Sequence, residues 1–187
     1  MGRGQAALGV ILSQVTLPRA ALGDGILTAR GDEAAYIAGA RWLTPAVLMF
    51  QEDVQNAFAT RATTVRLIDR GQLGAATALL RLDVTEFDAR YDPTAGGAPT
   101  VVVSLRATLT RADGRQLLQQ VFTERRPAAQ DRVSAIVQAY DAAVQGVMAQ
   151  AVDWTQAHTP VIAAELDPAA PTALPPPPVR ASRRLPQ

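Results

Sequence analysis

The chain has 187 residues, of which 48% are apolar, and its formal net charge at pH 7 is +1. This length and apolar content suit one folded domain, and the balanced charge excludes a whole-molecule attraction to nucleic acid or to an anionic membrane. The sequence has neither cysteine nor lysine, which excludes disulfides, thiolate nucleophiles, lysine Schiff bases and phosphate-loop lysines. No stretch approaches the roughly 20 apolar residues that a membrane-spanning helix needs.

Three strands are predicted at the start of the chain. Residues Leu8 to Leu17 are apolar, include β-branched side chains and end at Pro18, which predicts a buried strand. The segments Ile26 to Arg30 and Glu33 to Ile37 flank Gly31-Asp32. This spacing predicts a hairpin.

A helix is predicted to begin at Thr44 and Pro45 and to end near Arg61. Thr44 can cap free backbone N–H groups, and proline suits the first turn because its missing N–H costs nothing there. Glu52, Asp53 and Gln55 are expected to face water. One buried stripe is predicted from apolar residues at spacings of three and four, namely Leu43, Val47, Phe50, Val54 and Phe58.

The middle of the chain predicts strands. A short one is expected over Thr63 to Asp69, followed by a loop that contains Gly71 and Gly74. Apolar and polar residues then alternate from Ala76 to Tyr91 and from Thr100 to Arg111, so each segment predicts a long strand with one buried face. In the first of these, the buried face is expected to carry Leu80, Leu82 and Val84, and the other face Arg81, Asp83 and Thr85.

Asp113-Gly114 predicts a hairpin after the second long strand. Both residues tolerate the positive φ of a type I′ turn, and Leu117 to Glu124 supplies the return strand. The loop from Asp92 to Pro99 between the two long strands is predicted to project and to serve contact or self-association.

A second amphipathic helix is predicted from about Asp131 to about Thr155, after which the composition changes to alanine and proline. The chain is therefore divided into a domain over residues 1–158 and a disordered tail over residues 159–187. The run Pro175 to Pro178 is interpreted as a spacer, with docking into an aromatic groove as the alternative. The buried stripe of this helix is expected to contain Val133, Ile136, Tyr140, Val144, Val147, Ala151 and Trp154.

These elements predict a mixed α/β fold in two or three layers. A largely antiparallel sheet carries two amphipathic helices packed on it, with a long-stranded meander between the helices in the sequence.

No catalytic, cofactor or metal site is predicted. His158 is the only histidine and lies at the expected end of the last helix, so a Ser-His-Asp triad is disfavoured. The glycines at 2, 4 and 9 follow no strand and make no dinucleotide fingerprint. Arg125-Arg126 and Arg183-Arg184 lack the surrounding basic and aromatic residues of a nucleic-acid site. The carboxylates Asp83, Glu86, Asp88 and Asp92 fit no calcium loop and are expected on a solvated face.

The segment from Tyr36 to Trp42 has the most distinctive sequence in the chain. In one interpretation Trp42 packs before the helix, while Arg41 lays its stem on apolar surface and keeps its charge in water. In the other, Tyr36, Arg41 and Trp42 form a contact for a partner or a lipid. We keep both open and favour the first.

A series of degenerate segments occurs in a characteristic order: Tyr36, Gly39-Ala40-Arg41-Trp42, the helix Leu43 to Phe58, Leu80 to Phe87, the strand from Val101, Gly114, Phe122, Ala135 to Asp141 and Asp153-Trp154. Together, their order and spacing resemble the ABC-type transport auxiliary lipoprotein family of the PqiC or YmbA type. The resemblance covers most of residues 8 to 158.

The resemblance implies a lipoprotein without catalysis, held at the outer membrane and facing the periplasm. Its implied role is an accessory one in lipid transport between the inner and outer membranes, which maintains envelope integrity. The implied partners are a Mce-domain (MlaD-like) substrate-binding protein and an ABC permease complex, with a phospholipid-like ligand and a homo-oligomer as further expectations. No cofactor and no nucleic acid are expected.

The chain departs from the family pattern at its start. Met1 to Ala7 does not look like a secretory signal, and the sequence has no lipid-attachment cysteine and no strand before Leu8. The signal and the outer-membrane anchor are therefore expected to be missing from this sequence. The alternative function is a periplasmic protein-docking module for a cell-wall or secretion assembly, and an enzyme ranks third.

Overall fold

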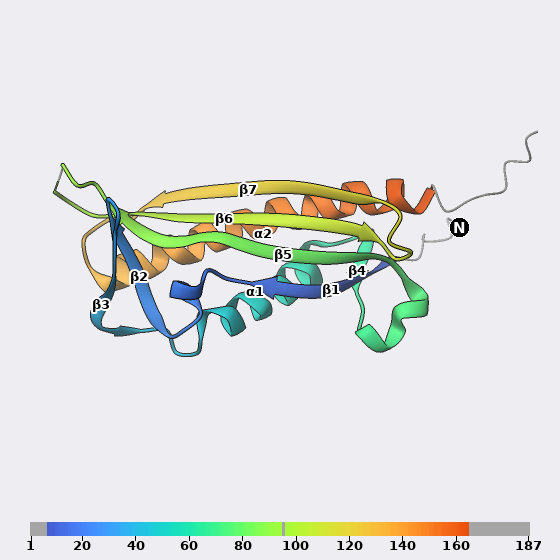
Figure 1. Ribbon diagram of the computed structural model, residues 1–187, viewed down its shortest axis with the longest axis horizontal. Coiled ribbons are helices and arrows are strands. Elements are labelled where there is room, and N and C mark those ends of the chain that lie inside the picture. The colour runs from blue at the N-terminus through green and yellow to red at the C-terminus, as the bar shows by residue number, and fades with distance from the viewer. Residues whose placement is uncertain (1–6, 95, 165–187) are drawn as a thin grey trace, which may run out of the picture.

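The computed structural model describes residues 7–94 and 96–164. Seven strands form one sheet, and two long helices pack against one of its faces (Figure 1). The predicted mixed α/β class is confirmed, and the arrangement has two layers.

The N-terminal half supplies one side of the sheet and the first helix. The two-stranded hairpin is confirmed, and its second strand continues four residues beyond the predicted end at Ile37. The elements are β1 (Leu8–Thr16), η1 (Arg19–Ala21), β2 (Gly25–Arg30), β3 (Glu33–Arg41), α1 (Ala46–Arg61), β4 (Val65–Leu67) and η2 (Arg70–Ala75).

The C-terminal half supplies the predicted meander and the second helix. The two long strands have the predicted bounds. Burial alternates along β5 as predicted, whereas β6 is largely buried on both faces, including Val102 and Ser104 on its expected polar face. The elements are β5 (Ala76–Tyr91), β6 (Thr100–Arg111), β7 (Leu117–Pro127) and α2 (Val133–Ala164).

β5 is the central strand of the sheet. One of its edges pairs with β6 in antiparallel orientation, while the other edge pairs in parallel first with β1 and then with β2. β4 lies beyond β1, β3 beyond β2, and β7 beyond β6. The sheet is thus antiparallel in the meander and in the β2–β3 hairpin, and parallel on both sides of β1.

The core lies between the sheet and the two helices. α2 packs over β6 and β7, α1 packs over β1 and β4, and the helices contact each other. Leu80, Leu82 and Val84 on β5 are buried against this layer, as their alternation predicts. The opposite face of the sheet carries the polar residues of the same strands.

The start of α1 differs from the prediction. The helix begins at Ala46, the N-cap position is Pro45, and no side chain caps it. Leu43 is fully exposed because it precedes the first turn and therefore lies outside the helical stripe. Ala46 takes the inward position instead, four residues before the buried Phe50. The predictions of a Thr44 cap and of a buried Leu43 are wrong.

The turn between β6 and β7 also differs. Gly114 has φ of 76°, but no other type of residue has a positive φ in the described part of the chain, so the turn is not type I′. The Asp113 carboxylate instead accepts hydrogen bonds from the guanidinium of Arg111 (2.8 Å) and the backbone N–H of Arg115 (3.0 Å). These bonds hold the pKa of Asp113 well below its usual range.

α2 is longer than predicted and continues past Pro160 to Ala164. Thr159 and Ile162 are fully buried, so packing offsets the backbone hydrogen bond that proline cannot donate. Val133, the first residue of the expected stripe, is exposed. Residues 165–187, the rest of the expected tail, lie outside the described residues, and their disorder stays a prediction.

The loop between β5 and β6 lies at one end of the elongated molecule (Figure 1). The Asp92 carboxylate accepts hydrogen bonds from the backbone N–H (2.8 Å) and the hydroxyl (2.7 Å) of Thr94, which order the first turn of the loop. Ala95 lies outside the described residues. The proposed role of this loop in contact or self-association stays a prediction.

Gly9 on β1 is expected to tolerate no side chain. A Cβ atom there would lie 2.6 Å from the carbonyl oxygen of Ala75, which is backbone and cannot rotate away. Gly9→Ala is expected to lower the free energy of unfolding by about 1–3 kcal/mol, the usual cost of overpacking, in urea denaturation. At Gly74 a Cβ atom would meet nothing within 4 Å, so Gly74→Ala is the control. Equal losses in the two variants would refute this explanation.

Candidate functional site

The three residues singled out in the sequence diverge at the end of β3. The ring of Tyr36 lies over Gly25, and its hydroxyl donates to the carbonyl of Ala20 (2.8 Å). The exposed guanidinium of Arg41 pairs with both carboxylate oxygens of Asp24 (3.1 and 3.2 Å). These side chains line a hollow of about 450 Å³ beside β2 and β3.

Trp42 lies apart from the other two. Its backbone N–H donates to the carbonyl of Asp24 (2.6 Å), and its half-buried ring packs edge-on against Tyr140 of α2, with ring centroids 5.2 Å apart. The ring therefore packs before the helix, as the first interpretation expects. It also lines a different cavity, between α1 and α2.

Four aromatic rings meet at this end of the core. The ring of Phe87 lies 4.9 Å from Tyr140, 6.3 Å from Trp42 and 6.4 Å from Phe50, measured between centroids. The Tyr140 hydroxyl donates to the backbone carbonyl of Leu27 (2.7 Å), which satisfies its polar group. Burial, together with the charge of Asp88, raises the pKa of Tyr140 far above its ordinary value.

A β-bulge brings Phe87 into this cluster. The register of β5 against β6 shifts between Val84 and Glu86, so Thr85 is the extra residue. Strict alternation after Val84 would turn Glu86 inward and Phe87 outward. The bulge reverses the two, so Phe87 is buried while Glu86 stays on the polar face.

The cavity beside these rings has a volume of about 310 Å³. Its walls are mostly apolar, and the polar side chains at its edge are Asp53, Gln138 and Asp141. A second hollow of about 570 Å³ shares Asp53 and Val144 with the first and follows the helices toward Arg61. We call the two together the interhelical groove. The first hollow is lined by Trp42, Ala46, Met49, Phe50, Phe87, Val137, Tyr140 and Val144, with the three polar residues.

The edge of the groove is acidic. Burial raises the pKa of Asp53, and the neighbouring charges of Asp141 and Glu52 raise it further. Asp141 accepts hydrogen bonds from the amide of Gln145 (3.1 Å to each oxygen). In the described part of the chain, neither Asp53 nor Asp141 forms an ion pair. The groove thus suits a ligand with an apolar body and a cationic end.

An ion pair joins the helices near the other end of the groove. The Nε and Nη2 atoms of Arg61 donate to the two carboxylate oxygens of Asp153 (2.8 and 2.7 Å). This bidentate contact lowers the pKa of Asp153. It holds the last turn of α1 against α2.

A larger hollow of about 700 Å³ lies between the end of α1 and the segment from β4 to η2. Its lining includes the charged residues Arg66, Asp69 and Arg70 and a single aromatic residue, Phe58. We therefore regard the interhelical groove as the candidate site.

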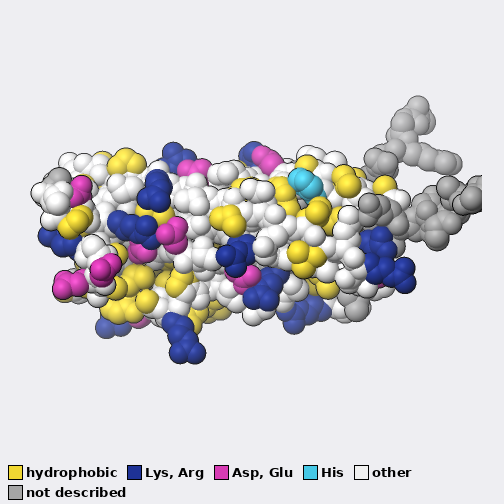
Figure 2. Space-filling view, turned by 45° about the horizontal axis from the view of Figure 1, so that its top comes forward, with side chains coloured by type: hydrophobic (Ala, Val, Ile, Leu, Met, Phe, Trp, Pro, Cys, Tyr) yellow, Lys and Arg dark blue, Asp and Glu magenta, His cyan; other side chains and the backbone are white. Residues whose placement is uncertain are grey.

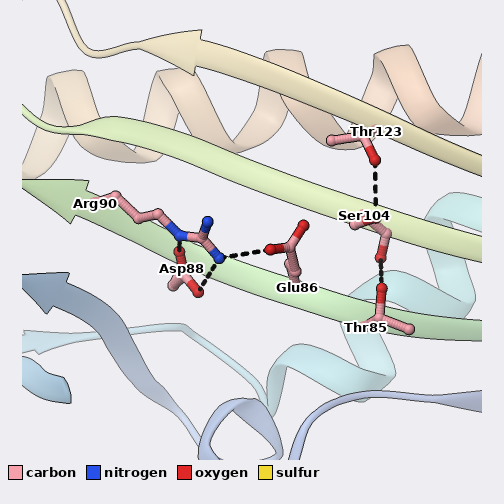
Figure 3. A network of polar contacts seen from close by, with 6 residues as sticks. All are labelled: Thr85, Glu86, Asp88, Arg90, Ser104 and Thr123. Atoms are coloured by element: carbon pink, nitrogen blue, oxygen red, sulfur yellow. Dashed lines mark hydrogen bonds and ion pairs between the residues drawn. The ribbon is translucent and has the colours of Figure 1, made fainter. Parts of the chain in front are cut away.

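The acidic residues of β5 lie on the polar face of the sheet, but they are less solvated than predicted, since the side chains of Asp83 and Asp88 are only 17% and 16% exposed. The guanidinium of Arg90 donates to Asp88 (2.7 Å) and Glu86 (2.7 Å), and Ser104 and Thr123 share a hydrogen bond beside them (2.9 Å; Figure 3). Among the residues that the structure describes, no three metal-ligating side chains come together. Arg90 pairs with both carboxylates and offsets one of their two negative charges, which supports a structural role for the network.

His158 makes only local contacts on α2. Its Nδ1 atom lies 2.8 Å from the carbonyl oxygen of Trp154, and the centroid of its ring lies 5.0 Å from that of the Trp154 indole. Both contacts are with a residue one helical turn away.

On the face shown in Figure 2, arginine and acidic side chains are interspersed. In the basic pair Arg125-Arg126, the guanidinium of Arg126 forms an ion pair with Glu124 (2.9 Å). Across residues 7–94 and 96–164, no helix combines the length and apolarity that crossing a bilayer requires.

Sequence reasoning found Trp42 and assigned Phe50 and Tyr140 to buried stripes, but it did not bring them into one site. It placed Asp53 correctly on the exposed side of α1 but did not predict that its carboxylate is partly covered beside Asp141, and it attached no role to this residue. Phe87 was missed because a constant alternation continued from Leu80 and Val84 places it on the polar face, whereas the bulge shifts the alternation by one residue. The signal that could have found the groove is the coincidence of aromatic residues at facing positions of both predicted helices.

Comparison with known proteins identifies the fold and the family. A crystal structure of a protein from Xanthomonas campestris matches with a TM-score of 0.74 at 21% identity, over 86% of this chain and 90% of that one. An uncharacterised protein matches with a TM-score of 0.55 at 19% identity, over 85% of this chain and 92% of that one. At these identities the likeness shows the fold alone.

The curated proteins give no match. The family model of the ABC-type transport auxiliary lipoprotein component matches residues 2–152, which include both helices of the groove up to Val152. This span is most of the chain and confirms the resemblance seen in the sequence. The protein belongs to the family of ABC-type transport auxiliary lipoprotein components.

Proposed function

We propose that this protein is a non-catalytic accessory component of a Mce-type ABC transport system that moves lipids between the inner and outer membranes. Membership of a lipoprotein family implies an envelope-associated protein that works with a transporter. The proposed setting is the periplasm, with attachment to the outer membrane through an N-terminal lipid. The proposed partners are a Mce-domain substrate-binding protein and the ABC permease.

The interhelical groove is the observation that carries the proposal. Its aromatic and aliphatic walls offer apolar surface to an acyl chain, and its volume of about 310 Å³ at the Trp42 end falls within the range of small-ligand sites. Trp42 would then contact the lipid, whereas Tyr36 and Arg41, beside Asp24, would face a protein partner. This division refines the single contact expected from the sequence.

The lipid contact is tested by filling the groove. Met49 is half-buried and lines the cavity, whereas its neighbour Leu48 is exposed and does not. The full chain is incubated with phospholipids from a Gram-negative envelope, and native mass spectrometry counts the bound lipid. Met49→Trp is expected to abolish binding, because the indole occupies the space of the acyl chain, while Leu48→Trp is expected to retain it.

Partner binding is measured in the same preparations by cross-linking to the Mce-domain protein. Lipid binding that survives Met49→Trp in a folded variant would contradict the groove as the lipid site. Absence of both lipid and Mce-domain contact would contradict the proposed function as a whole. Contact with the Mce-domain protein without lipid would reduce the role to docking.

A further inference from the structure

The chain that follows α2 is chemically complementary to the interhelical groove. Beyond Asp167 it has no acidic residue, and it carries the run Pro175 to Pro178 followed by Arg180, Arg183 and Arg184. A proline run presents a preformed apolar ridge that packs well on aromatic side chains. Arginine pairs readily with carboxylates. The groove offers the matching surfaces, an apolar wall with Trp42 and an acidic edge.

The length of this segment also fits. Val144 lies 20 residues before Ala164 on α2, which is about 30 Å at a helical rise of about 1.5 Å per residue. A chain that turns back from Ala164 and advances about 3.1 Å per residue reaches about 34 Å by Pro175. This is the longest reach, so the proline run can lie beside Val144, in the middle of the groove, with chain left over for the turn.

The arginines come next and reach the acidic edge. Asp141 lies one turn before Val144, and Asp53 faces it from α1. Arg180 is two residues beyond Pro178, which is about 6 Å of extended chain, and Asp141 is about 4.5 Å before Val144 along the helix axis. A proline run whose last residue, Pro178, lies beside Val144 therefore brings Arg180 to the two carboxylates. Arg183 and Arg184 follow within about 12 Å of extended chain.

We propose that residues 172–184 dock in the interhelical groove of their own chain, with the proline run on its apolar wall and the arginines beside Asp53 and Asp141. Tethering supports this occupant, because a short linker raises the effective concentration of a weak ligand to the millimolar range. A segment that is disordered when free can order on such a surface. Docking itself does not depend on the proposed function. Its consequence, that a lipid must displace the segment, does.

The absence of cysteine permits a direct test on the full chain. Ser182→Cys provides a single site for a nitroxide spin label, and amide signals are recorded by NMR. The amides of Met49, Asp53 and Gln138 are expected to lose most of their intensity. The amide of Thr123, on the far face of the sheet, is expected to keep it. Uniformly weak losses across the molecule would overturn the proposal.

A charge-reversed variant tests the arginines without touching the folded domain. Changing Arg180, Arg183 and Arg184 to glutamate is expected to restore the groove signals, since both sides would then be negative. The control reverses three exposed arginines outside the groove and gives the same net charge, namely Arg19, Arg66 and Arg106. Restoration by both triple variants, or by neither, would count against docking at Asp53 and Asp141.

Two further experiments identify what occupies the interhelical groove. In the first, spin-labelled protein without isotope enrichment is mixed with isotope-enriched protein that carries no spin label. Strong losses of amide signal in this mixture would report contact between two copies and would overturn docking within one chain. Dihexanoyl phosphatidylethanolamine is then added. Recovery of the groove signals supports displacement by lipid. If lipid binds and the groove signals do not recover, lipid does not compete with the segment, and docking itself is unaffected. If no lipid binds, the result contradicts the proposed function but not docking.

Discussion

Replacing Phe50 with alanine is expected to lower the free energy of unfolding by about 3–5 kcal/mol, the usual cost of a buried phenylalanine. Phe50 is 1% exposed and packs on Phe87, with ring centroids 6.4 Å apart, beneath the groove. Its loss removes buried apolar surface and leaves a cavity that the rigid sheet cannot fill. Chemical denaturation followed by circular dichroism measures the change.

Leu43 provides the control for this variant, since the sequence pattern assigns it to the same buried stripe. The structure exposes it completely, so Leu43→Ala is expected to change stability by no more than about 0.5 kcal/mol. A large loss at Leu43 would contradict the start of α1 at Ala46. Because the groove loses a wall, Phe50→Ala is also expected to bind lipid less tightly than Leu43→Ala.

Replacing Ile162 with alanine is expected to cost about 2–5 kcal/mol of stability, as for other buried isoleucines. Ile162 is 0% exposed and lies beyond Pro160, in the final turns of α2. If the sequence interpretation were right and a disordered tail began at residue 159, the same substitution would have no effect. The free energy of unfolding of the full-length Ile162→Ala variant, measured by chemical denaturation, distinguishes a packed end of α2 from a disordered tail.

The adjacent Val161 is the matched control. It lies on the same turn but is 53% exposed, so Val161→Ala is expected to stay within about 0.5 kcal/mol of the parent. Similar effects at both positions would mean that this end of α2 does not pack as described. The comparison needs no assumption about residues 165–187.

The strands were predictable where burial alternates residue by residue. β5 has the predicted bounds and the alternating burial. β6 also has the predicted bounds, although both of its faces are largely buried and only its sequence alternates between apolar and polar residues. The ends of the helices were harder to predict from the sequence. Thr159-Pro160 is a strong local stop signal, yet the buried Thr159 and Ile162 outweigh it. Tertiary packing of this kind is invisible to a local pattern.

The candidate site was only partly predictable, for geometric reasons. Neighbouring residues of an extended chain point to opposite sides, so Arg41 and Trp42 separate although the sequence joins them. Phe87 reaches the groove through a one-residue bulge, which shifts the alternation without altering composition. Asp53 and Asp141 lie on different helices, and only the packing of α1 against α2 brings their charges together.

The position of β1 has a consequence for how the chain reaches this fold. Its two neighbours in the sheet, β4 and β5, both follow it in the sequence, and the hydroxyl of Ser13 bonds to the carbonyl of Leu80, 67 residues away. As synthesis proceeds from the N-terminus, this apolar segment has no strand to pair with until β4 and β5 have been made, when about half of the domain exists. Until then the nascent protein carries an aggregation-prone stretch, whereas the meander that follows can assemble from local contacts.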